Sequence, residues 1–227
     1  MPDSLRRVHR FLLAQAFYPL VFASLVSLGM FSVRLVLSHR LHYVNLVWNL
    51  FLAWAPYVFS LLAALLQRWK PHAWMLLLII SGLWLIFFPN ALYIVTDFYH
   101  LEMRPPIPLW FDIGLISLYA FSGCFLAAAS LRSMQHLARR YLGRLLGWLF
   151  AGAAIALSAV GVYLGRFGRW NSWDLFENPW AIFKDIALPA INPFENPGFL
   201  GFTLMFTALM LVIYLMFVNL SPSLEEV

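Results

Sequence analysis

Six separate stretches of this chain are each long and apolar enough to cross a lipid bilayer. A transmembrane helix needs about 20 mostly apolar residues to cross the hydrocarbon core. The stretches run over Leu12–Val36, Leu46–Leu66, Ala73–Val95, Leu109–Leu131, Leu145–Tyr163 and Phe199–Val218. The sequence therefore predicts an all-α integral membrane protein, a six-transmembrane helix bundle, with residues 1–227 forming a single membrane domain.

The composition excludes a soluble protein. Of the 227 residues, 63% are hydrophobic and 11% are charged, whereas a soluble domain has roughly 45–50% apolar and about 25% charged residues. The net charge of +5 does not indicate nucleic-acid binding, because no soluble domain carries a basic patch. The single cysteine, Cys124, lies in an apolar run, which excludes an internal disulfide and a cysteine-rich metal site.

The basic residues favour an orientation with both termini in the cytoplasm, because Lys and Arg are retained on that side. Nine basic residues then lie inside, while six lie outside: Arg34, Arg40, Arg104, Arg166, Arg169 and Lys184. Seven of the ten acidic residues also fall outside, and so does the longest loop, 165–198. Loops of that length in compact proteins usually carry function or structure of their own. We therefore expect any functional site on the outer face.

The long outer loop contains a short repeat. Phe176-Glu177-Asn178-Pro179 recurs as Phe194-Glu195-Asn196-Pro197. Asn-Pro pairs initiate turns, since Asn bonds its own backbone and the residue before Pro avoids the helical region. One interpretation is a pair of turns bracketing a short interfacial helix over Trp180–Leu188. The other is a duplicated binding motif.

Two amide side chains within the spans lie near prolines that interrupt helical hydrogen bonding. Asn49 precedes Pro56 in the second span, and Asn90 follows Pro89 in the third. Carbonyl groups freed by Pro in a membrane must find partners in neighbouring helices or side chains. Asn49 and Asn90 are therefore either interhelical hydrogen-bonding residues or parts of a binding site.

The ionisable residues near the outer face suggest acid–base or metal chemistry. Asp97 and His100 share a helix face at a spacing of three residues, and such a pair can hold a divalent metal or relay a proton. Asp112 lies near the start of the fourth span, where an unpaired carboxylate is costly. Asp97, Asp112 and Asp174 can form a three-carboxylate cluster facing Arg166, Arg169 and His100. The candidate catalytic residues are Asp97, His100, Asp112 and Asp174, and the candidate ligands for a divalent metal cofactor are Asp97, His100 and Asp174.

A polar and aromatic segment follows the fifth span. Arg166 and Arg169 are spaced to bind a phosphate or carboxylate group through their guanidinium groups, and the candidate binding residues Trp170, Asn171 and Trp173 follow directly. The alternative is structural: the Trp residues anchor the protein at the membrane interface, and the Arg residues pair with Asp97, Asp112 or Asp174.

Three segments resemble a known family: Trp48–Trp54 (WNLFLAW), Phe87–Asp97 (FFPNALYIVTD) and Gly165–Asp174 (GRFGRWNSWD). The chain is similar in them to a bacterial family of six-span membrane proteins catalogued as domain of unknown function 1361. The resemblance covers most of residues 45–175. It implies a multi-pass protein of the bacterial inner (plasma) membrane and assigns no activity.

Three functions remain open. The first is an enzyme or binding protein for an anionic lipid or polyprenyl headgroup at the outer leaflet. The second is a structural or assembly subunit that docks a partner through the aromatic outer loop, since Trp, Tyr, Phe and Arg are typical of interaction hot spots. The third is a small-solute or proton-coupled transporter whose kinked spans form the site. The expected partners are membrane lipids and either another protein or a second copy of the chain, and the question of catalysis stays open.

Overall fold

The computed structural model describes residues 3–192 and 194–220, and the regular structure in these ranges is helical. Within these ranges, six helices are long and apolar enough to span a membrane, as the sequence predicts. The helices are α1 (Asp3–Ala14), α2 (Phe17–Ser38), α3 (Val44–Trp69), α4 (Trp74–Tyr93), α5 (Leu109–Leu142), α6 (Arg144–Tyr163), α7 (Asp174–Glu177), α8 (Pro179–Ile191) and α9 (Pro197–Leu220). A 3₁₀ helix, η1 (Ile94–His100), continues α4, and a π-helical turn, η2 (Leu164–Gly168), continues α6.

The first span begins later than the sequence predicts. The chain breaks between α1 and α2, where Ala16 has a left-handed backbone with φ of 56°. The Tyr57 hydroxyl donates to the backbone carbonyl of Gln15 at 2.8 Å, and the Ser133 hydroxyl donates to the side-chain oxygen of Gln15. These contacts fix the break, so residues 12–14 belong to the polar amphipathic helix α1 and the span starts at Phe17.

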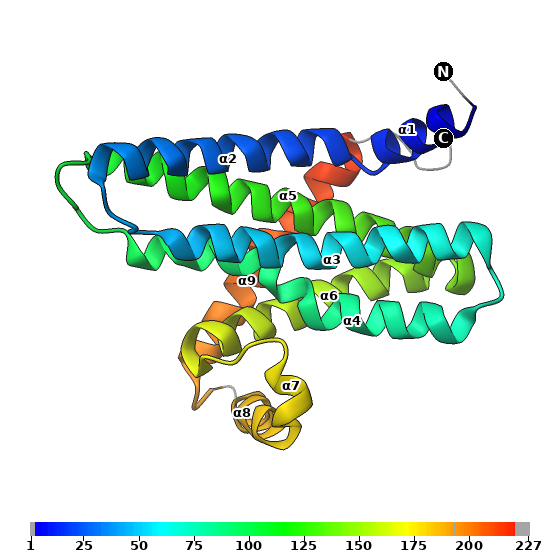
Figure 1. The fold of residues 1–227 in the computed structure, drawn as a ribbon. Coiled ribbons are helices and arrows are strands. Elements are labelled where there is room, and N and C mark those ends of the chain that lie inside the picture. The colour runs from blue at the N-terminus through cyan, green and yellow to red at the C-terminus, as the bar shows by residue number, and fades with distance from the viewer. Residues whose placement is uncertain (1–2, 193, 221–227) are drawn as a thin grey trace.

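Helix α5 is the central helix of the bundle. It contacts α2, α3, α4, α6 and α9, and Figure 1 shows it running beside α2 and α3 while α9 crosses obliquely behind them. Small side chains permit this close packing: a Cβ at Gly123 would lie 2.4 Å from the Ala91 carbonyl oxygen. The one cysteine, Cys124, is buried beside it. The helix continues to Leu142, past the predicted end of the span at Leu131.

One end of the bundle carries most of the polar side chains discussed below. We call it the η1 end: α2 ends, α3 begins and η1 lies there, at the left of Figure 1. The predicted orientation with both termini inside makes this the outer end, and that orientation stays a prediction.

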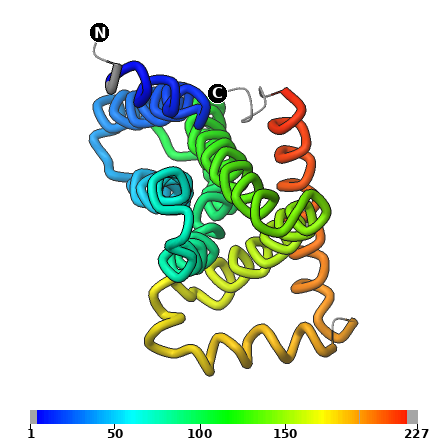
Figure 2. The backbone as a smooth tube through the Cα atoms, turned by 90° about the vertical axis from the view of Figure 1, so that its right-hand side faces the viewer, coloured from blue at the N-terminus to red at the C-terminus, as the bar shows by residue number. Residues whose placement is uncertain are grey.

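Helices α7 and α8 form a separate layer beside the bundle. Figure 1 views α8 nearly end-on, whereas Figure 2 shows it lengthwise along the side formed by α4, α6 and α9. The predicted short helix over Trp180–Leu188 is therefore present within α8. Both copies of the Phe-Glu-Asn-Pro repeat start helices, because Pro179 begins α8 and Pro197 begins α9. Pro suits the first helical position, where no backbone N–H bond is lost.

Candidate functional site

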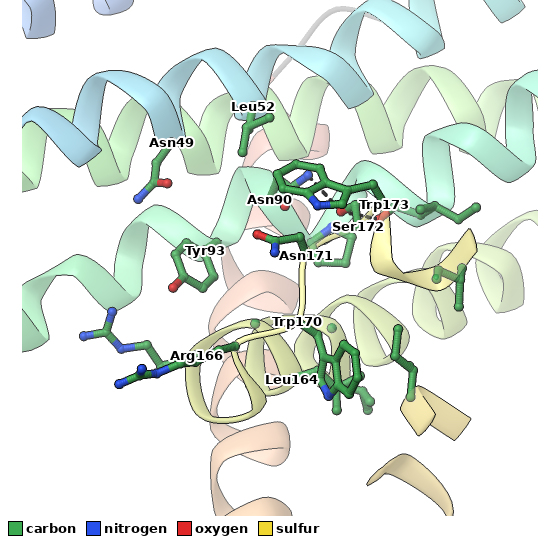
Figure 3. A pocket seen from close by; sticks show the side chains of 18 of the residues that line it. Asn49, Leu52, Asn90, Tyr93, Leu164, Arg166, Trp170, Asn171, Ser172 and Trp173 are labelled. Carbon is green, nitrogen blue, oxygen red and sulfur yellow. Dashed lines mark hydrogen bonds between the residues drawn. The ribbon is translucent and has the colours of Figure 1, made fainter. Parts of the chain in front are cut away.

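A groove of about 780 Å³ lies between the transmembrane helices and the α7–α8 layer. Its volume is in the range of small-molecule sites. Apolar side chains from α3, α4, α6, η2 and α8 form much of its wall, among them Leu52, Leu85, Val160, Leu164 and Ile182. All seven candidate binding residues also line it, as Figure 3 shows in part: Asn49, Asn90, Arg166, Arg169, Trp170, Asn171 and Trp173.

Two glycines of the α6 segment bring it close to α4. A Cβ at Gly161 would lie 2.5 Å from Cγ of Pro89, and one at Gly165 would lie 3.1 Å from the ring of Tyr93. A methyl group at Gly161 would therefore force the two helices apart. Pro89 and these glycines therefore set how closely α4 and the α6 segment approach each other beside the groove.

The chain then turns sharply away from α6. The π-helical turn η2 ends at Gly168 and is followed by Arg169, a non-glycine residue with φ of 57°. The backbone N–H of Trp170 donates to the carbonyl of Leu164 at 3.3 Å. Widened turns of this kind often occur at functional sites. The indole N–H of Trp170 donates to Asp185 of α8 at 2.8 Å, so the turn also holds α8 beside the bundle.

Ser172 holds the following loop against α4 beside Pro89. Its hydroxyl donates to the carbonyl of Ile86 at 3.1 Å and accepts a hydrogen bond from the Asn90 amide at 3.1 Å. The loop thereby closes one side of the groove.

The groove contains two guanidinium groups without a carboxylate partner. Arg166 contacts Nε2 of His100 at 3.0 Å and lies over the Tyr99 ring, 4.8 Å from its centroid. A guanidinium group only donates, so Nε2 of His100 accepts and the imidazole is neutral in this arrangement. Arg169 is exposed and forms no hydrogen bond or ion pair within residues 3–192 and 194–220.

Asp97 lies behind the groove wall rather than inside the groove. The residue is 1% exposed, and its carboxylate accepts hydrogen bonds from the amides of Asn49 at 2.7 Å and Asn45 at 3.3 Å. Two donors compensate part of the cost of burying a charge. Although Asp97 and His100 are three residues apart, the structure gives them different partners.

Asp112 is held in a closed ion pair with Arg34. The Arg34 Nε and Nη2 atoms donate to the two carboxylate oxygens at 2.6 and 3.0 Å, and both side chains are 0% exposed. The expected cluster of Asp112 with Asp97 and Asp174 is therefore not formed. The sequence analysis counted Arg34 among the basic residues of the outer side and gave it no partner. Its burial next to Asp112 makes it the partner that a carboxylate in a span requires.

Asp174 forms hydrogen bonds within its own loop. Its carboxylate accepts from the backbone N–H of Asn171 at 2.6 Å and from the side-chain amide of Asn171 at 3.1 Å. The expected metal ligands Asp97, His100 and Asp174 thus have three different sets of contacts. Within the described residues, no group of three or more His, Cys, Asp or Glu side chains is arranged to hold a metal ion.

Comparison with known proteins identifies the family. Residues 48–213 match the family described as "Protein of unknown function (DUF1361)". The chain belongs to this DUF1361 family. No curated protein and no solved structure matches it. Every residue of the groove lies within the matched part of the DUF1361 chain, whereas Arg34 precedes it.

Sequence reasoning about this DUF1361 chain missed three side chains that form hydrogen bonds with candidate residues: Arg34, Asn45 and Ser172. Arg34 had a usable signal, since an Arg inside an expected span requires a partner. Asn45 precedes Asn49 by one helical turn, and this spacing places two amides on one face. Ser172 carried no signal of its own, because its role depends on where the loop meets α4.

Proposed function

We propose that this DUF1361 protein binds an anionic phosphate headgroup of a membrane lipid in the groove, on the outer leaflet of the bacterial inner membrane. The observation that supports this most directly is the pair of guanidinium groups at an apolar groove, neither of which forms a salt bridge within the described ranges. Arg166 contacts the imidazole of His100 and the ring of Tyr99, and Arg169 has no polar partner in the described ranges.

The chemistry of arginine favours phosphate as the ligand. A guanidinium group presents several donors in a plane that matches two oxygens of a phosphate. Because the surroundings are partly apolar, the attraction is stronger than in bulk water. Arg166 can exchange its contact with neutral His100 for one with an anion without breaking an ion pair.

The apolar walls favour a lipid over a free phosphate. Leu52, Leu85 and Leu164 line the same groove as the arginines. They come from helices long enough to span the membrane, so a ligand with an apolar tail can cover these walls while its headgroup meets the guanidinium groups. We assign binding rather than catalysis, since the carboxylates of Asp97, Asp112 and Asp174 are already engaged by amides or by Arg34.

The experiment is a binding measurement on the protein in nanodiscs. Wild type and the double variant Arg166→Gln/Arg169→Gln are titrated with dioleoylphosphatidic acid against a phosphatidylcholine background, and retained lipids are identified by native mass spectrometry. We expect the double variant to bind at least about tenfold more weakly, since each charge-assisted hydrogen bond contributes about 1.5–3 kcal/mol. Arg40→Gln is the matched control, because Arg40 is an exposed cation at the same end that does not line the groove.

Two results would contradict lipid binding. One is a wild-type protein that retains no anionic lipid and shows no preference for phosphatidic acid over phosphatidylcholine. The other is an equal loss of binding in Arg40→Gln and in the double variant, which would indicate nonspecific attraction to positive charge.

A second candidate function, an assembly subunit, rests on the exposed aromatic side chains of the α7–α8 layer and of the segment between α8 and α9. Phe176, Trp180, Phe183 and Phe194 are between 56% and 89% exposed. Aromatic residues are enriched in interaction hot spots. Co-purification of a stoichiometric protein partner that is lost with Trp180→Ala and Phe183→Ala would favour this function.

A further inference from the structure

Three asparagine side chains from three separate segments face the groove. Asn49 comes from α3, Asn90 from α4 and Asn171 from the loop after η2. Figure 3 shows them around one space, with Tyr93 beside them. Each amide has one donor end and one acceptor end, so its orientation decides which kind of ligand group it can bind.

The contacts of these amides fix all three orientations. Asn49 faces the Asp97 carboxylate and Asn171 faces the Asp174 carboxylate, and an ionised carboxylate only accepts. Both residues must therefore present their NH₂ groups to those partners. The hydroxyl of Ser172 gives its one proton to the Ile86 carbonyl, so it can only accept from the NH₂ group of Asn90.

The same argument leaves three carbonyl oxygens available. In each asparagine the NH₂ group is engaged, while the Oδ1 atom receives no hydrogen bond within the described ranges. Asn49 and Asn90 are half-buried, and Asn171 is exposed. The anion of a phosphodiester has no proton to donate to these oxygens. The phosphate assigned to Arg166 and Arg169 therefore cannot account for them.

We propose that the lipid headgroup carries several hydroxyl groups besides its phosphate, as a sugar or another polyol does. This inference rests on the proposed function, and it names the headgroup class. Hydroxyl groups donate to the three amide oxygens, while the phosphate receives hydrogen bonds from the arginines. A headgroup ammonium also donates, but the two neighbouring guanidinium groups repel it. The exposed indoles of Trp48 and Trp173 provide flat apolar surfaces for the C–H faces of a sugar ring.

The test compares two lipids with equal charge and equal chains. Dioleoylphosphatidylinositol and dioleoylphosphatidylmethanol are both monoanionic phosphodiesters, and only the first has headgroup hydroxyls. The full-length protein is studied in lauryldimethylamine oxide, because maltoside detergents would themselves supply sugar hydroxyls. We expect the inositol lipid to bind at least about tenfold more tightly, since three hydrogen bonds each contribute a modest net amount.

Matched variants separate the amide oxygens from the stability of the fold. Asn49→Ala and Asn45→Ala each remove one donor to Asp97, but only Asn49 lines the groove. Asn171→Ala and Asn196→Ala each remove a local hydrogen bond of the loop region, and only Asn171 lines the groove. The ratio of the two lipid affinities should fall about threefold or more in Asn49→Ala and Asn171→Ala. It should stay at the wild-type value in the two controls.

The possible outcomes distinguish this inference from the proposed function. Tight binding of both lipids with equal affinity would overturn the hydroxyl inference and leave anionic lipid binding standing. Binding of neither lipid would overturn both. Tighter binding of phosphatidylethanolamine than of the inositol lipid would overturn the hydroxyl inference and indicate that an ammonium group is the donor to the amide oxygens. Displacement of the inositol lipid by inositol 1-phosphate at equal concentration would support a ligand with hydroxyl groups and a phosphate. It would overturn the claim that this ligand is a lipid.

Discussion

Two arginine sites at the η1 end of the bundle differ in their partners and in their access to ligands. Arg34 is fully buried and bound by both carboxylate oxygens of Asp112. Arg166 is half-buried at an open groove and contacts the neutral imidazole of His100. The first site is closed and internally compensated, whereas the second keeps a positive charge available. Charge near a membrane face therefore indicates a ligand site only when the partner and the access are known.

The strongest test of this comparison removes one member of the closed pair. Asp112→Leu leaves the Arg34 guanidinium buried without a counter-charge, so we expect a loss of about 3–5 kcal/mol of stability. Fluorescence-detected size-exclusion chromatography after heating measures it as a large fall in melting temperature and yield.

The control for that variant replaces both members. Arg34→Met/Asp112→Leu removes the uncompensated charge and should recover much of the loss, since an apolar pair of similar volume often replaces a buried ion pair at little cost. A single variant that melts at the wild-type temperature would mean that the pair does not hold α2 against α5.

An intermediate effect is expected where α4 meets α6 below the open site. Gly161→Ala places a Cβ about 2.5 Å from Pro89, and overpacking of this kind costs about 1–3 kcal/mol. Gly152→Ala is the matched control, because nothing lies within 4 Å of a Cβ at that position on the same helix. It should be neutral or stabilise by up to about 1 kcal/mol. Thermal melting of the two variants compares them, and equal destabilisation of both would contradict the tight contact at Pro89.

The smallest effect is expected at His42, in the loop between α2 and α3, where its ring contacts Arg104 at 3.1 Å. Partial burial, followed by the positive charge of Arg104, lowers the pKa of His42 below its usual value of 6.5. The unfolded chain then binds the proton more readily than the folded one. The stabilising contribution is therefore present above pH 6.5 and is lost as the pH falls through the lower folded-state pKa.

His42→Asn keeps an acceptor for Arg104 but does not titrate. We expect its melting temperature to change less than that of the wild type between pH 7 and pH 5. Parallel curves for the two proteins would show that His42 makes no contribution to the pH dependence.

The six spans could be predicted from the sequence because hydrophobic length is a local property. The helix starts were less accurate where a tertiary contact decides them: α1 separates from α2 because Tyr57 and Ser133 hold the break at Gln15. Local sequence patterns also selected segments that meet in the structure, since Asn49, Asn90 and Arg166 line one groove. Ligand binding in that groove stays a proposal.

The partners of the charged residues could not be predicted in the same way. Arg34 and Asp112 are 78 residues apart, and their pairing depends on which faces of α2 and α5 meet. Asp97 and His100 share a helical spacing, but Asp97 turns to two amides of α3 while His100 meets η2. Residue spacing indicates which side chains share a face of one helix, whereas the partners of these charged residues lie on other helices.

The burial of Cys124, the chain's one cysteine, makes the wild-type protein a ready background for chemical labelling. A thiol-specific reagent has little access to the buried side chain of Cys124 in α5, so a cysteine introduced at exposed Glu195 would be the main reactive thiol. A reagent that cannot cross the bilayer would then report from which side of the membrane the loop beside the groove is reached. No native residue would first have to be removed from the packed centre of the bundle.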